Sequence, residues 1–266
     1  MGELAERRMT LEGEMRAGIL RGDFVLHYQP KIQLPSRHIV GMEALVRWNH
    51  PEKGLISPVE FIPLAEENGL IIQLGEWILF QACSDTKEWL DAGYDLRVAV
   101  NLSSRQFQQE NLVKIVESAL RVNDLPTKNL ELEITESMVM GDMDKVIALL
   151  QAFRDRDIHI SVDDFGTGYS SLSYLKRFPI HALKIDQSFI RDMHNDEDDS
   201  SIVKAIVSMG HSLRLKIVAE GVEQVEHLDM LESLGCQMIQ GYYFSKPLLK
   251  EHLWALLKDK KQSFHQ

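Results

Sequence analysis

Two adjacent aspartates, Asp163 and Asp164, end an alternating apolar run in the stretch "IHISVDDFGTGYSS", residues 158–171. Glycines and small hydroxyl residues follow them at once. The pair could belong to a simple surface turn. If both carboxylates reached one place, however, they could bind two divalent cations about 3.5–4 Å apart, the arrangement that clamps the attacking and leaving oxygens of a phosphoryl transfer. The other strand ends distinguish these interpretations.

Carboxylate, amide and basic side chains also occur at the ends of the other expected strands. In a parallel barrel these ends meet at one mouth, so residues far apart in the sequence would come together. A single acidic residue there is usually solvated, but several anions share a confined site only when cations neutralise them. Carboxylate and amide oxygens without paired His or Cys favour Mg²⁺ or Mn²⁺ over zinc. The candidates are Gln29, Glu43, Arg47, Asn101, Glu133, Glu136, Asp163, Asp164, Lys184, Asp186, Glu220, Glu223 and Gln240.

Three of these candidates have specific expected tasks. Lys184 offers a compact ammonium that tolerates a crowd of anions. Arg47 offers a planar fork that fits a phosphate, although an ion pair at the barrel rim would also explain it. The stretch "FGTGYSS" would form a loop free to close over the mouth, because glycine gives the backbone freedom. We expect Glu136 to anchor that loop by accepting hydrogen bonds from its amides or hydroxyls.

Short apolar runs alternate with amphipathic stretches along most of the chain, which is the pattern of βα units. We expect the first strand to close at Pro30, and Ser57 and Pro58 to begin a helix. Strands are predicted at residues 24–30, 38–48, 96–103, 129–137, 158–164, 180–186 and 215–222, and the last strand with its exit loop at 236–247. Helices are predicted at residues 57–69, 70–93, 107–124, 142–157, 169–179, 200–214, 224–235 and 250–261.

About eight strands in a chain of 266 residues predict a TIM-type (β/α)8 barrel. The first two strands are joined only by "LPSRH", residues 34–38, and so short a link favours antiparallel neighbours. We therefore expect a modified barrel whose first strand runs against the rest. An open doubly wound sheet is the alternative, and it is disfavoured because no glycine-rich phosphate fingerprint follows the first strand.

The bulk composition limits the function classes. The chain is 44% hydrophobic and carries 29 Lys and Arg against 40 Asp and Glu, a net charge of −11. Such a chain binds DNA or RNA duplexes and anionic lipid poorly. Two distant cysteines exclude a disulfide framework and fit a reducing compartment. With no signal peptide and no spanning segment, we expect a cytoplasmic protein in which residues 1–22 form a lead-in helix or linker.

Eight stretches of sequence, in order, resemble one family. They run from "LHYQPK" through "EALVRW" (residues 43–48), "NLS", "EITES", "DDFGTGYSSL", "LKID" and "AEGVE" to "GYYFSKP". The chain resembles the EAL domain, the cyclic-di-GMP phosphodiesterase module of bacteria, over essentially its whole length. The resemblance implies one barrel domain at residues 23–262, TIM-like, with its first strand antiparallel.

The resemblance also implies roles for individual residues. Lys184 would hold or polarise the attacking water, and Glu220 would be the general base unless a metal ion made a separate base unnecessary. Gln29, Leu45 and Arg47 would meet the substrate, and Gln240 would support the substrate, water or metal cluster. One metal would be bound by Glu43, Asn101, Glu133 and Asp163, and a second by Asp163 and Asp164 with Glu220 near.

The function implied is hydrolysis of cyclic di-GMP to linear pGpG, by attack of a metal-activated water on one phosphodiester. Two Mg²⁺ or Mn²⁺ ions are expected during turnover, and Ca²⁺ is expected to inhibit. The resemblance further implies a homodimer, and an upstream regulatory domain could precede this segment.

Two other functions remain open at this stage. A catalytically silent version of the fold would serve as a cyclic-di-GMP receptor or a protein-interaction module, but the complete ligand set favours an active enzyme. A sugar-phosphate or carboxylate enzyme could also use Mg²⁺ and a lysine at strand ends, and a substrate screen would separate it. A glycosidase needs only two carboxylates and leaves Asn101, Lys184 and the aspartate pair without a task.

Overall fold

The computed structural model describes residues 2–140, 142–168 and 175–260. Eight strands close into a barrel in the order β1, β9, β8, β7, β6, β5, β4, β2 and back to β1. β1 is antiparallel to both neighbours, whereas β2 and β4 to β9 are parallel. The expected antiparallel first strand is therefore confirmed. The barrel strands are β1 (Phe24–Gln33), β2 (Ile39–His50), β4 (Arg97–Asn101), β5 (Leu130–Thr135), β6 (His159–Phe165), β7 (Ala182–Ile185), β8 (Lys216–Ala219) and β9 (Met238–Ile239).

Two short strands extend the sheet outside the ring. β3 (Gly54–Ile56) pairs with β2, and β10 (Leu248–Leu249) pairs with β1, both antiparallel. We expected β1 to end at Pro30, but it continues to Gln33. Pro30 falls between the part of β1 that pairs with β10 and the part that pairs with β9. Its missing N–H therefore interrupts neither of these two ladders.

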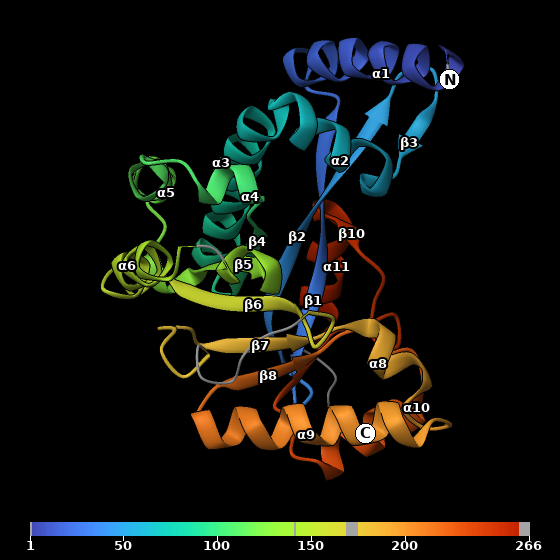
Figure 1. Ribbon diagram of the computed structural model, residues 1–266, viewed down its shortest axis with the longest axis vertical. Helices are drawn as coiled ribbons and strands as arrows, with labels where there is room; N and C mark the ends of the chain where they lie inside the picture. The colour runs from blue at the N-terminus through green and yellow to red at the C-terminus, as the bar shows by residue number, and fades with distance from the viewer. Residues whose placement is uncertain (1, 141, 169–174, 261–266) are drawn as a thin grey trace.

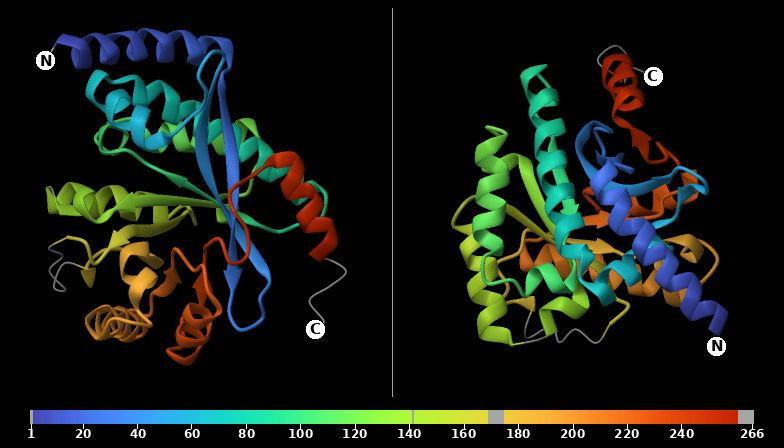
Figure 2. Two further views of the ribbon diagram at one scale, coloured as in Figure 1. Left: turned by 90° about the vertical axis from the view of Figure 1, so that its right-hand side faces the viewer. Right: turned by 90° about the horizontal axis from the view of Figure 1, so that it is seen from above.

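Helices surround the outside of the barrel, with α5 and α6 on one side of Figure 1 and α9 and α10 at its lower edge. α1 lies across the end of the long β1–β2 ribbon, and α11 packs beside β1 (Figure 2). The helices are α1 (Gly2–Arg21), α2 (Pro58–Asn68), α3 (Leu70–Asp91), α4 (Ser104–Phe107), α5 (Leu112–Val122), α6 (Met143–Arg154), α8 (Gln187–Asp192), α9 (Glu197–Leu213), α10 (Val225–Ser233) and α11 (Lys250–Lys260), with 3-10 turns η1 (Thr127–Asn129) and η2 (Glu136–Met140). No described helix is long and apolar enough to cross a membrane.

Besides the end of β1, the predicted bounds of one helix are wrong. The single helix expected at 107–124 is two helices, because a capping box between Ser103 and Gln106 starts α4 early and α4 ends at Phe107. Residues 236–247, expected to hold the last strand and its exit loop, contain the two-residue strand β9. The helix expected at 169–179 lies largely outside the described residues. Ser57 does precede α2 and Pro58 begins it, as expected.

The alternation along β5 explains how the barrel holds a polar site. Leu130, Leu132 and Ile134 are buried, on the face that the helices cover. Glu131 and Glu133 lie on the opposite face and are also buried. Both contact Lys31 of β1, three strands away around the ring, so these side chains meet across the barrel interior. The interior of this barrel is therefore lined in part by charges.

Candidate metal centre

A β-bulge places the two adjacent aspartates. Val162 of β6 pairs with Leu183 of β7 and Phe165 pairs with Ile185, so two residues of β6 oppose the single residue Lys184. Asp164 has a φ of +53°, in the left-handed region that aspartate tolerates better than most residues. Its amide donates a hydrogen bond of 2.9 Å to Asp163 Oδ1. The bulge breaks the alternation that would otherwise point the two carboxylates to opposite faces.

Carboxylate oxygens gather in two overlapping groups around this bulge. In the first, one oxygen each from Glu43, Glu133 and Asp163 lie within 4.8 Å of one another. In the second, Asp163, Asp164 and Glu220 do the same. Asp163 belongs to both. Five predicted metal ligands or neighbours, from β2, β5, β6 and the end of β8, thus lie together.

Lys184 lies at the centre of these carboxylates. Its Nζ is 2.7 Å from Glu133 Oε2 and from Glu220 Oε1, and 3.0 Å from Asp163 Oδ2. The side chain is fully buried, which alone would lower its pKa. The surrounding carboxylates outweigh burial and hold the pKa of Lys184 well above its ordinary value, so it stays an ammonium.

One lysine does not neutralise five carboxylates. Burial, together with the charges of Asp163, Glu43 and Glu133, raises the pKa of Glu220 to about 8 despite the opposing effect of Lys184. Burial and the carboxylates of Asp163 and Asp186 likewise raise the pKa of Asp164 to about 6. Burial is the larger cause of both shifts, and the neighbouring carboxylates add to it. Hard oxygen donors with excess negative charge fit divalent cations such as Mg²⁺ and Mn²⁺.

Amide side chains complete the first group. Asn101 Nδ2 donates to Glu43 Oε1 at 2.7 Å, which leaves the Asn101 oxygen free to face a cation. Gln240 Nε2 donates to Glu43 Oε2 at 2.6 Å and to Gln29 Oε1 at 3.0 Å. Gln29 in turn donates to the carbonyl of Ser245 at 3.2 Å, which fixes the orientation of both amides because a carbonyl can only accept. Gln240 Oε1 is buried and has no hydrogen-bond partner among the described residues.

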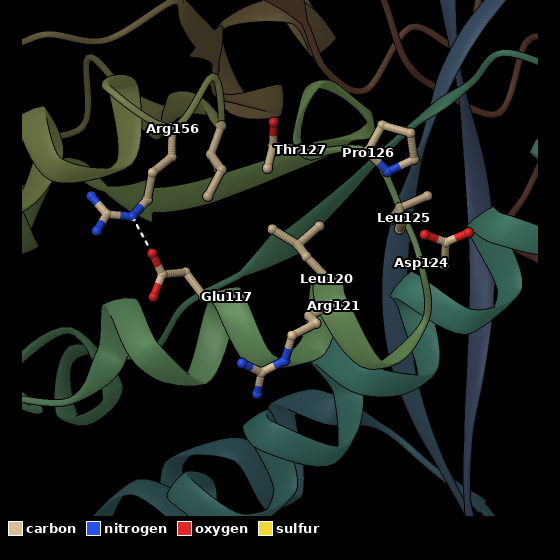
Figure 3. A pocket seen from close by; sticks show the side chains of 9 residues that line it. Glu117, Leu120, Arg121, Asp124, Leu125, Pro126, Thr127 and Arg156 are labelled. Atoms are coloured by element: carbon tan, nitrogen blue, oxygen red, sulfur yellow. Dashed lines mark hydrogen bonds and ion pairs between the residues drawn. The ribbon is translucent and has the colours of Figure 1, made fainter.

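A cavity of about 240 Å³ opens beside these groups, and Gln29, Glu43, Leu45, Asp163, Glu220 and Gln240 line it. Gln187 and Tyr242 also line it, and the sequence did not single them out. Arg47 is half-buried on β2, and its Nη1 donates to the Val46 carbonyl at 2.8 Å instead of lining the cavity. A larger hollow, about 460 Å³ between α5 and the loop after it, contains the Glu117–Arg156 ion pair and none of the predicted site residues (Figure 3).

Glu136, which opens η2, contacts the turn after the aspartates. Its Oε2 accepts hydrogen bonds from the amides of Gly166 at 3.1 Å and Gly168 at 3.3 Å. A Cβ at Gly168 would lie 2.8 Å from Glu136 Oε1, so only glycine allows this approach. Most of the loop that follows lies outside the described residues, and the anchoring role of Glu136 stays a prediction.

Sequence reasoning missed a second lysine below the metal centre. Lys31 Nζ lies 2.6 Å from Glu133 Oε1 and 2.8 Å from Glu131 Oε1. Ser161 Oγ also donates to Glu131 Oε1 at 2.8 Å. A signal existed in "QPK": Lys31 stands two residues after Gln29, and alternate residues of a strand share a face.

Comparisons with known proteins agree with this geometry. The family model described as "EAL domain" matches residues 12–247. The bifunctional diguanylate cyclase/cyclic di-GMP phosphodiesterase MucR of Pseudomonas aeruginosa is 47% identical over 256 residues, 96% of this chain and 37% of that protein. The cyclic di-GMP phosphodiesterase NbdA of the same species is 44% identical over 245 residues, 92% of this chain and 31% of that protein.

A solved structure, the PaMucR phosphodiesterase in complex with c-di-GMP, matches with a TM-score of 0.90 and 48% identity, covering 92% of this chain and 99% of that one. The chain spans about a third of the length of the curated relatives it matches. The family match over most of the chain and the shared barrel lead to one conclusion: this chain belongs to the EAL domain family.

Proposed function

We propose that this chain hydrolyses one phosphodiester bond of cyclic di-GMP and releases linear pGpG. The observation that carries the proposal is the pair of overlapping carboxylate groups that share Asp163, with Lys184 between them. The names of MucR, NbdA and the PaMucR complex support the choice of substrate. A catalytically silent receptor is the alternative, and the complete set of donors disfavours it.

The two groups would hold two divalent cations, Mg²⁺ or Mn²⁺, with Ca²⁺ as an inhibitor. Bound cations would supply positive charge to the phosphate and make water a stronger acid. The first ion would be held by Glu43, Asn101, Glu133 and Asp163, and the second by Asp163 and Asp164 with Glu220 near. The orphaned Gln240 Oε1 would accept a hydrogen bond from water at this centre.

The protein's own groups would divide the remaining work. Lys184 cannot act as a base because its raised pKa keeps it protonated, so it would donate hydrogen bonds to the attacking water and fix its position. Glu220, 2.7 Å from that ammonium, would receive the water's proton, a role its raised pKa suits when cations do not hold it as a ligand.

The substrate would lie in the cavity above these residues. Leu45 would give apolar contact to a guanine and Gln29 a polar one. Arg47 would exchange its bond to the Val46 carbonyl for a bidentate contact with phosphate. Glu136 would hold the turn at Gly166 and Gly168 in place beside the site.

We also propose that the barrel domain spans residues 23–262, forms a homodimer and follows an upstream regulatory domain. The longer relatives support the upstream domain, since each extends well beyond the matched part. Two buried free cysteines, Cys83 and Cys236, fit the reducing environment of the cytoplasm.

One assay tests the activity. The purified chain is incubated with cyclic di-GMP and Mg²⁺, Mn²⁺, Ca²⁺ or a chelator, and the products are separated by chromatography. We expect pGpG with Mg²⁺ or Mn²⁺ only. Tight binding of unaltered cyclic di-GMP under every condition would support the receptor instead, and turnover that persists in chelator would remove the metal ions from the proposal.

A further inference from the structure

The Glu133 carboxylate is shared between two buried lysines. Its Oε2 accepts from Lys184 at 2.7 Å, and its Oε1 accepts from Lys31 at 2.6 Å. Lys184 contacts Asp163 and Glu220 as well, whereas Lys31 contacts Glu131 and Glu133. Lys31 therefore reaches the metal centre through Glu133.

Lys31 separates two carboxylates that would otherwise repel each other. Glu131 and Glu133 are two residues apart on β5 and share its inner face, and both are buried. Lys31, itself only 3% exposed, enters from β1 and donates to both. Ser161 gives Glu131 a second donor, but Glu133 Oε1 depends on Lys31. Without this ammonium, Lys184 would still hold Oε2, but Oε1 would face Glu131 without a neutralising charge, and repulsion would rotate the carboxylate away from its orientation toward Glu43 and Asp163.

We propose that Lys31 is a positioning residue for metal binding, which acts by holding Glu133 through Oε1 so that the carboxylate is presented to the first cation. The proposal rests on the metal centre of the proposed function. A lysine that only neutralised Glu131 inside the barrel would leave metal affinity unchanged when it is removed, whereas removal of Lys31 in the proposed role lowers it. Partners that orient a metal ligand in this way typically change metal affinity by about 10–100-fold when they are removed.

Direct binding of Mn²⁺, measured by calorimetry on metal-free protein without substrate, tests the idea apart from hydrolysis. We expect Lys31→Met to weaken Mn²⁺ binding by about 10-fold or more. Glu131→Gln is the matched control: it alters the same network but leaves the Lys31–Glu133 contact, so its affinity should stay within about twofold of the wild type. Activity of Lys31→Met should recover as Mn²⁺ is raised, with the KM for cyclic di-GMP unchanged at saturating metal.

Removing a buried ammonium can unfold a protein because it leaves carboxylates unpaired. The double variant Lys31→Met with Glu131→Gln removes one charge of each sign and keeps the size of both side chains, and circular dichroism checks that it folds. We expect the same loss of Mn²⁺ affinity in this variant. A folded double variant that binds Mn²⁺ as tightly as the wild type would overturn the proposal. If the wild-type protein binds Mn²⁺ but leaves cyclic di-GMP intact, the proposed function is wrong, whereas the proposed role of Lys31 in metal binding is unaffected.

Discussion

The amide of Asp164 donates a hydrogen bond to the carboxylate of Asp163, its neighbour in the chain, at 2.9 Å. This bond forms because Asp164 has a left-handed backbone in a bulge opposite Lys184. Two carboxylates that a regular strand would direct to opposite faces thereby reach one site. The local backbone and the proposed two-metal chemistry thus depend on the same residue.

Substitutions at Asp164 should separate its backbone role from its charge. Asn tolerates the left-handed region, so Asp164→Asn should keep the melting temperature and lose about 100-fold or more in turnover with the loss of a ligand. Asp164→Ala should lose the same activity and also about 1 kcal/mol of stability, because Ala is strained at this φ. Thermal melts and initial rates check both. Full activity in Asp164→Asn would remove this carboxylate from the metal centre.

Glu43 should be indispensable for turnover. Glu43→Ala removes an oxygen donor of the first group and the acceptor of Asn101 and Gln240, so we expect the rate to fall by about 1,000-fold or more. Glu226→Ala, which removes an exposed carboxylate from α10, should be neutral. Initial rates measured with excess Mg²⁺ test this prediction. Undiminished activity of Glu43→Ala would refute the assignment of Glu43 as a metal ligand.

Between about pH 7 and 9, the stability of the metal-free protein should fall as pH rises. Glu220 and Asp164 have pKa values of about 8 and about 6, above the ordinary 4.5 and 3.8, so the folded state holds their protons more tightly than the unfolded chain. That stabilisation is complete below about pH 4 and is lost as pH passes 6 and then 8.

Melting curves from pH 7 to 9 in chelator test this, with Glu220→Gln as the control whose curve should flatten over that range. Mg²⁺ should raise the melting temperature more at pH 8.5 than at pH 6, because cations compete with protons for the carboxylates. A melting temperature that rises steadily with pH in chelator would contradict the prediction.

The turn beside the site should tolerate no side chain at residue 168. Gly168→Ala places a Cβ 2.8 Å from Glu136 Oε1, so the turn must move away from its anchor. We expect about a tenfold loss of kcat with little change in melting temperature, since loop displacement disturbs positioning more than the core. Gly13→Ala, whose added Cβ meets nothing within 4 Å, is the control. Equal kinetics for both variants would argue against the anchoring role.

The sequence predicted the barrel and its reversed strand because these follow from local features. The five-residue link between the first two strands forced an antiparallel pair, and the periodic apolar runs located the others. The gathering of Glu43, Glu133 and Asp163 followed from the parallel order, since the ends of parallel strands share one edge. The individual roles of these residues stay predictions.

Features that depend on ring closure were not predictable in this way. "LELEIT" alternates as a half-exposed strand does, so nothing local indicates that Glu131, deeper in the strand than Glu133, is also buried inside the barrel. Lys31 from across the barrel pairs with both carboxylates, and Lys184 pairs with Glu133 as well. The bulge at Asp164 also escaped detection, because its sole sequence signal is an Asp pair that many surface turns share.

The strand that starts the barrel is also the one that completes it. Ile32 and Gln33 of β1 pair with Ile239 and Met238 of β9, more than 200 residues later in the chain. During biosynthesis the β1–β2 hairpin can form early, but the seam between β1 and β9 must wait until β9 has been synthesised. Closing so long a loop also carries an entropic cost. Gln29 and Gln240 meet across that seam, so a nascent chain or proteolytic fragment that stops before Met238 would be incapable of assembling the cation pocket.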